Sequence, residues 1–122
     1  MILFFLQLGR ILMVENKFKL VKTVYKLVRV RKDGTLGPLF INARLRIPMG
    51  KWLMAESYPT KGFAYRPGWH CCFEMNAPHL KKTSSRVWVE CRVRDYITYD
   101  RPESQGGAWV LADHIKFVKI IG

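Results

Sequence analysis

Residues 86–94 read R-V-W-V-E-C-R-V-R, and this stretch decides the fold class. Small apolar side chains alternate throughout with larger or charged ones. Successive side chains of a β-strand point to opposite faces, so this strict alternation predicts a strand with one buried face. The buried face is expected to carry Val87, Val89, Cys91 and Val93, and the opposite face Trp88, Glu90, Arg92 and Arg94.

Shorter strands are predicted along the rest of the chain, between turn signals such as Asp33-Gly34. We expect them at 24–31, 40–47, 52–56 (or one helical turn there), 69–74, 96–99 (after a bulge), 108–112 and 115–121. Convincing helical periodicity is lacking. The chain is therefore predicted to be mainly β, or α+β with one or two short helices. The architecture is a single-domain twisted antiparallel sheet, sandwich or half-barrel over residues 17–122.

Residues 1–16 are interpreted as an N-terminal arm or extension. The opening M-I-L-F-F-L-Q-L is apolar but lacks the basic start and small-residue cleavage site of a signal peptide. It is also too short for a membrane-spanning helix, which needs about 20 apolar residues. The alternative is an edge strand or a short helix docked on the core.

Positive charge is concentrated in two blocks. The chain has 21 Lys and Arg against 9 Asp and Glu, a net charge of +12. Nine basic residues and one acid fall in 17–46, and five basic residues and one acid fall in 81–94. This pattern predicts a positive face that binds nucleic acid or an acidic protein surface. The expected anion-binding residues are Arg44, Arg46, Arg66, Lys81, Trp88, Arg92 and Arg94.

The three cysteines are interpreted as free thiols, which predicts residence in a cytoplasm, either that of the chain's own cell or that of a host cell. Cys71 and Cys72 are adjacent and would point to opposite faces of a strand, so they cannot ligate one zinc ion together. No metal and no cofactor are expected.

Residues 63–80 read F-A-Y-R-P-G-W-H-C-C-F-E-M-N-A-P-H-L and contain the densest side-chain chemistry. His70 and His79, with Arg101 and Glu103, would suit metal-independent acid–base catalysis on a phosphodiester. The alternative is that both histidines are structural. The polar loop 101–107 offers a further ligand site at Ser104, Gln105 and Gly106, or is a plain hairpin loop.

The chain resembles a family of small uncharacterised phage and prophage proteins from about residue 25 to its end. The resemblance rests on K-D-G-T-L-G-P-L-F (32–40), I-P-M-G-K-W (47–52), R-P-G-W-H (66–70), A-P-H (77–79), V-W-V-E (87–90) and R-P-E-S-Q-G-G (101–107). It implies no activity. A fainter similarity, carried by Arg29, the segment around His70 and Glu103, is to the ADP-ribosyltransferase fold, although the Ser-Thr-Ser and Glu-x-Glu patterns are missing.

These features predict a small basic phage-type protein that engages nucleic acid or a host nucleic-acid-handling defence machine, for example as an inhibitor. The alternative is a small enzyme, either a metal-independent nuclease or an ADP-ribosyltransferase-like protein. The sequence leaves open whether the partner is DNA, RNA or protein, and which oligomeric state the chain adopts.

Overall fold

A computed structural model describes residues 17–40, 42–55 and 68–122. These residues form six strands and one short 3-10 helix. Their bounds are β1 Lys22–Val30, β2 Leu36–Gly37, β3 Trp52–Met54, β4 Trp69–Cys72, β5 Arg86–Asp100, η1 Glu103–Gln105 and β6 Ala108–Ile120. The expected arm at 1–16 lies outside the described residues, as does Arg66.

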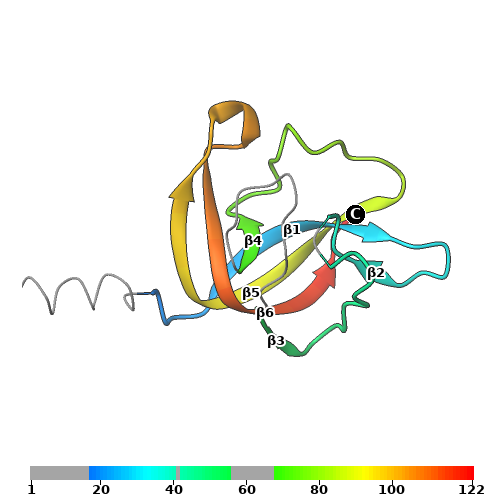
Figure 1. The fold of residues 1–122 in the computed structure, drawn as a ribbon, viewed down its shortest axis with the longest axis horizontal. Coiled ribbons are helices and arrows are strands. Elements are labelled where there is room, and N and C mark those ends of the chain that lie inside the picture. The colour runs from blue at the N-terminus through cyan, green and yellow to red at the C-terminus, as the bar shows by residue number, and fades with distance from the viewer. Residues whose placement is uncertain (1–16, 41, 56–67) are drawn as a thin grey trace, which may run out of the picture.

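The strands form one antiparallel sheet that curls back on itself. β1 pairs with β5, β5 with β6, and β6 with β4. β4 then returns to β1 through the residue pair Tyr25 and Cys72, which closes the circuit. Figure 1 shows β5 and β6 as a long curved hairpin with β1 crossing beside it. The prediction of a mainly β, half-barrel-like domain is confirmed.

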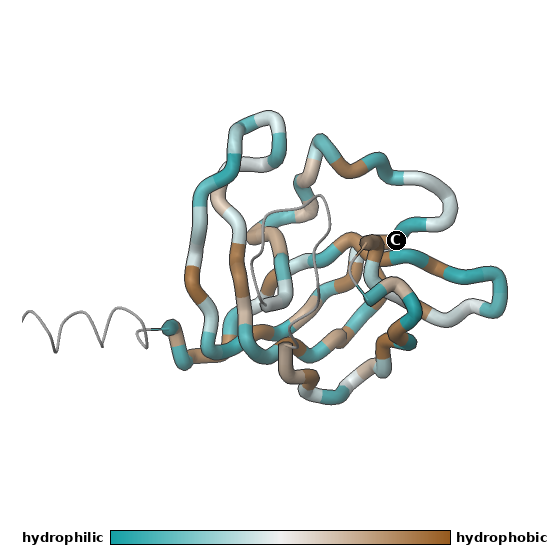
Figure 2. The backbone as a smooth tube through the Cα atoms, viewed as in Figure 1, coloured by the Kyte–Doolittle hydropathy of each residue, from teal (hydrophilic) through white to brown (hydrophobic). Residues whose placement is uncertain are grey.

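The core occupies the inside of this curl. It contains the alternating residues Val89, Cys91 and Val93 of β5, all fully buried. Trp69 and Phe73 pack against the same cluster, whereas Cys72 belongs to a second one with Ala77 and Trp109. The alternation predicted for 86–94 is therefore confirmed, and that predicted for 69–74 holds within β4, which ends at Cys72. In Figure 2 the turn that follows β1 is hydrophilic, in contrast to the apolar stretches of the strands.

The β5–β6 hairpin is longer than the sequence predicted. Residues 86–100 form one strand, and the two runs predicted at 108–112 and 115–121 are a single strand, β6. The irregularity lies between Glu90 and Cys91, where the register shifts, and not before Tyr96. Asp95 has a positive φ of 54° but leaves the register of its neighbours unchanged.

The strand predicted at 40–47 is wrong: the described residues 42–47 form a turn and an extended segment outside the sheet. The guanidinium of Arg31 explains the difference. It donates hydrogen bonds to the carbonyls of Leu36, Ala43 and Leu45 at 2.9, 2.6 and 2.9 Å. A side chain directly after β1 therefore satisfies backbone acceptors that a neighbouring strand would otherwise have to pair.

Residues 17–19 are anchored to the hairpin by ion pairs. Lys17 lies 2.6 Å from Asp113, and Lys19 lies 2.8 Å from Asp95. The backbone of Phe18 also bonds to that of Tyr96 in both directions, and the two rings stack at 5.0 Å. Across residues 17–40, 42–55 and 68–122, no helix is long and apolar enough to cross a membrane.

Candidate anion-binding groove

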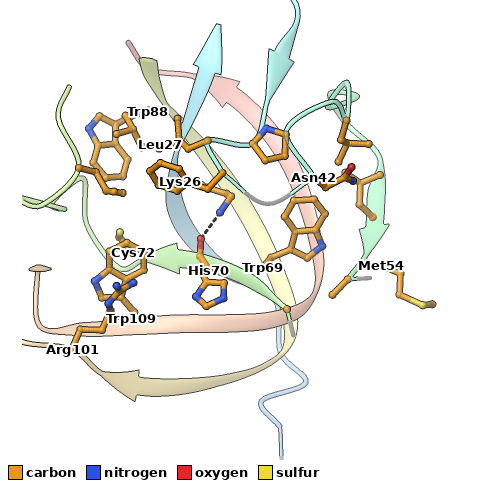
Figure 3. A pocket seen from close by; sticks show the side chains of 18 of the residues that line it. Lys26, Leu27, Asn42, Met54, Trp69, His70, Cys72, Trp88, Arg101 and Trp109 are labelled. Atoms are coloured by element: carbon orange, nitrogen blue, oxygen red, sulfur yellow. Dashed lines mark hydrogen bonds between the residues drawn. The ribbon is translucent and has the colours of Figure 1, made fainter. Parts of the chain in front are cut away.

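A groove of about 690 Å³ crosses β1 and β4. All four tryptophans contribute to its lining: Trp52, Trp69, Trp88 and Trp109. Figure 3 shows Trp88, Trp109 and Arg101 on one side of Lys26, and Trp69, Asn42 and Met54 on the other. The volume lies within the usual range for small-molecule sites, and an apolar wall with a few polar groups is typical of them.

Lys26 brings an ammonium group into the centre of this groove. Val24 and Val28, on either side of it in β1, are fully buried, so the alternation of the strand turns Lys26 inward. Its Nζ donates a hydrogen bond of 2.7 Å to the carbonyl of His70. An ammonium group has three donors. Among the described residues this carbonyl is its one acceptor, so two donors remain unpaired.

Arg101 brings the second cation. Its guanidinium lies 4.6 Å from the centroid of the Trp109 ring, and its Nε donates to Gln105 Oε1 at 2.8 Å. Trp109 is held in turn by a hydrogen bond of 2.7 Å from its Nε1 to the Gln105 carbonyl. The stack therefore fixes the guanidinium plane and leaves its terminal nitrogens unpaired within the described part of the chain.

Cys72 lies close to both cations and does not neutralise them. Burial and the neighbouring Cys71 raise its pKa to about 12, although Lys26 and Arg101 act in the opposite direction. The thiol is therefore protonated at neutral pH. The described residues that line the groove include no Asp or Glu. Among the described residues, the groove thus holds two cations and no anionic side chain.

The two predicted histidines both line this groove. His70 Nδ1 lies 2.8 Å from the hydroxyl of Tyr99, whose ring meets the imidazole edge-on. His79 packs its ring 5.6 Å from that of Trp109. Desolvation on the packed side, together with nearby Arg101, lowers the pKa of His79. Its imidazole is therefore predominantly neutral at neutral pH.

The other residues of the predicted catalytic set and ligand loop are not gathered in the groove. Glu103 begins the 3-10 helix η1 and is exposed, with Ser104 beside it. Gln105 acts indirectly, through Arg101 and Trp109. Gly106 has a positive φ of 98° and packs against the carbonyl of Asn76. Loop 101–107 therefore serves chiefly to present Arg101 and Trp109.

The pairing of β1 with β5 brings the two basic blocks of the sequence together. Its register runs from Lys22 opposite Val93 to Arg29 opposite Arg86. Like charges directly opposite each other destabilise a sheet. Arg86 also lies 5.9 Å from the ring of Phe40, which is 51% exposed and lines the groove. The basic end of the sheet therefore adjoins one wall of the groove.

The residues predicted to bind anions are distributed over several parts of this surface. Arg44 and Lys81 are exposed. Arg46 and Arg92 are partly neutralised by ion pairs with Asp33 and Glu90, at 3.2 and 3.1 Å.

Two further predicted residues hold or line the walls of the groove. Arg94 lies 4.5 Å from the ring of Trp52, which Lys116 also approaches at 5.2 Å. Trp88 packs beside the cluster of Cys72, Ala77 and Trp109, and does not stand beside Arg92 on an open face.

The sequence reasoning missed Lys26 as a site residue. A signal for it was present: Lys26 is a charged residue between Val24 and Val28 on one side of the strand. Trp109 and Trp52 were not predicted as the stacking partners of Arg101 and Arg94, and the Trp52 contact joins segments that are distant in sequence. No group of three or more His, Cys, Asp or Glu that could hold a metal ion occurs in the described ranges.

The chain matches no protein-family model, no curated protein and no solved structure. Function must therefore be argued from the geometry and charge of the groove and of the surface beside it.

Proposed function

We propose that this protein binds single-stranded nucleic acid, with the sugar–phosphate backbone on the basic end of the β1–β5 pair and unpaired bases directed to the adjoining aromatic groove. The observation that supports this most strongly is the alignment of the two basic blocks, with Arg29 opposite Arg86. A polyanion would offset the repulsion between these like charges. Aromatic rings beside Lys and Arg are the usual platform for single strands.

The exposed ring of Phe40 adds a specific contact to this proposal. Arg86 lies over it at 5.9 Å, and Lys81 and Lys82 are exposed on the loop that leads into β5. Single strands stack their bases on such rings while neighbouring cations neutralise phosphates. The same cations would also attract an acidic protein, which lacks bases for the rings.

The test is the salt dependence of binding, measured by fluorescence anisotropy with a labelled single-stranded oligonucleotide. Each phosphate neutralised contributes about −0.7 to the slope of log K against log salt concentration. A site with three or more cations predicts a slope of about −2 or steeper. Arg86→Gln and Lys81→Gln should each make the slope shallower by about 0.7.

Lys51→Gln is the matched control, because Lys51 is exposed and lies outside both the β1–β5 pair and the groove lining. It should leave the slope nearly unchanged. An affinity that is absent, or that does not change with salt, contradicts the proposal. So does an interaction with a host protein that survives nuclease treatment and is lost in the same two variants, because the partner would then be an acidic protein.

A second candidate function, metal-independent RNA cleavage, is favoured by one observation: His70, His79 and Arg101 line the same groove. Neutral His79 would accept the proton of a ribose 2′-hydroxyl as its oxygen attacks phosphorus. Protonated His70 would donate a proton to the departing 5′-oxygen, and Arg101 would stabilise the charge on the phosphorane. The products are a 2′,3′-cyclic phosphate and a 5′-hydroxyl.

Incubation of RNA with the protein in the presence of EDTA tests this candidate. Cleavage should yield cyclic phosphate ends and should fall by at least about a hundredfold in His79→Ala, the usual scale for removal of an acid–base group. Unchanged RNA, or cleavage that the variant retains, contradicts it.

A further inference from the structure

We infer that the groove is a binding site for one nucleoside phosphate unit. The phosphate lies between Lys26 and Arg101, beside Cys72, and the base is directed towards Trp69. This inference rests on the proposed function and deepens it, because it assigns to the groove one unpaired nucleotide of the bound strand. A free nucleotide has the same chemistry and serves as the probe.

The phosphate position follows from the two cations. Lys26 is partly buried with two donors unpaired by described residues, and Arg101 is fixed against Trp109 with its terminal nitrogens unpaired there. Both line the same groove as Cys72, which Figure 3 shows between them, and the Cys72 thiol is uncharged at neutral pH. A partly buried cation without a counterion is unfavourable, and a phosphate offers acceptors to both side chains at once.

The base position follows from the groove on the other side of Lys26. In Figure 3 Trp69 lies across Lys26 from Arg101, so a ligand anchored between the cations extends towards its indole. Purine and pyrimidine rings carry a face that stacks on an indole.

Charge complementarity and ring content together favour a nucleotide over other amphipathic anions. A fatty acid would satisfy the cations and the apolar wall, but it offers no ring to the indoles. A carboxylate also provides fewer acceptor oxygens than a phosphate for the unpaired donors. Laurate is therefore included as a competing ligand.

Isothermal titration calorimetry of the full chain tests the site with AMP, adenosine, ribose 5-phosphate and laurate. AMP should bind with one-to-one stoichiometry, and each of the other three should bind at least about tenfold more weakly, the factor expected when one charge-assisted hydrogen-bond set or one stacked ring is lost. Equal affinities for AMP and ribose 5-phosphate would show that the groove has no site for the base. Laurate binding more tightly than AMP assigns the groove to an apolar anion and overturns the inference.

Matched variants test each half of the ligand. Lys26→Gln keeps a donor for the His70 carbonyl but removes the charge, and it should weaken AMP about tenfold while Lys51→Gln does not. Trp69→Phe should weaken AMP but not ribose 5-phosphate, and Tyr96→Phe, an aromatic variant outside the groove lining, should change neither. Weaker binding of both ligands in Trp69→Phe would contradict the direction assigned to the base.

Competition separates this inference from the proposed function. An oligonucleotide should displace AMP from the groove, which identifies the site as part of the path of the strand. If the oligonucleotide binds and AMP neither binds nor is displaced, the groove assignment fails and the proposed function stands. If AMP binds and the oligonucleotide does not, the proposed function fails and the groove is a site for free nucleotides.

Discussion

At the scale of single residues, Lys26 is the residue whose charge fits its apolar neighbours in the strand least well. Its position between Val24 and Val28 would suit an apolar side chain, and the strand instead turns an ammonium group inward to the His70 carbonyl. A residue that breaks a local rule without an internal compensation is expected at functional sites. The alternation of β1 is readable in the sequence, but that no described carboxylate lines the groove around Lys26 is visible only in three dimensions.

Gly106 is a residue whose replacement should destabilise the hairpin loop. It has a φ of 98°, and an added Cβ would lie 2.5 Å from the carbonyl oxygen of Asn76. Gly34 is the matched control, because its φ is 85° and a Cβ there meets nothing within 4 Å. Gly34→Ala should lower the free energy of unfolding by about 1 kcal/mol through backbone strain. Gly106→Ala should cost about 1–3 kcal/mol more, by chemical denaturation. Equal costs would contradict the close packing of the loop on Asn76.

His79 should titrate below the ordinary imidazole value of 6.5, because desolvation and then Arg101 lower its pKa. The unfolded chain therefore binds more protons than the folded one near this value, and the stability contributed by neutral His79 is present above pH 6.5 and lost as the pH falls through the folded pKa. A proton NMR titration measures the pKa directly. Arg101→Gln should raise it only in part, since desolvation is the larger cause. A pKa at or above 6.5 in the wild-type protein would show that the ring is not packed against Trp109.

At the scale of elements, strand alternation predicted β4 and β5 because each has one buried and one partly covered face. It failed at 40–47, although Leu45 and Ile47 alternate there with arginines. The reason is the Arg31 guanidinium, which binds three carbonyls of the 36–45 segment and removes its need for a neighbouring strand. A long-range side-chain bond of this kind leaves no mark in local periodicity.

Arg31→Lys should therefore loosen the segment that follows β2. A lysine has one nitrogen where the arginine has a fork of donors, so it cannot bind all three carbonyls. The free energy of unfolding should fall by about 1–3 kcal/mol, measured by chemical denaturation. Lys32→Gln is the control, since Lys32 is exposed and adjacent. Loss of stability in both variants, or in neither, would contradict the role given to Arg31.

At the scale of the whole molecule, the sequence predicted a curled antiparallel sheet and two basic blocks, and the β1–β5 pairing joins those blocks. Of the candidate site, His70, His79 and Arg101 do share a groove, but Glu103 does not. The groove itself was not predictable, because Trp69, Trp88 and Trp109 come from three different strands. Which strands lie side by side depends on the closure through Tyr25 and Cys72, and a single residue pair gives no sequence pattern.

A single strand of nucleic acid is proposed to lie over the basic end of β1 and β5 and to enter the tryptophan groove. A proton–nitrogen correlation spectrum recorded during titration with a short oligonucleotide tests it most directly, since the backbone amides and the four indole N–H groups are all visible. We expect shifts concentrated at the backbone amides of Arg29 and Arg86 and at the Trp69 indole. In Lys26→Gln we expect only the indole shift to be lost. Binding that leaves these signals unchanged, or that shifts only residues remote from the groove, would contradict it.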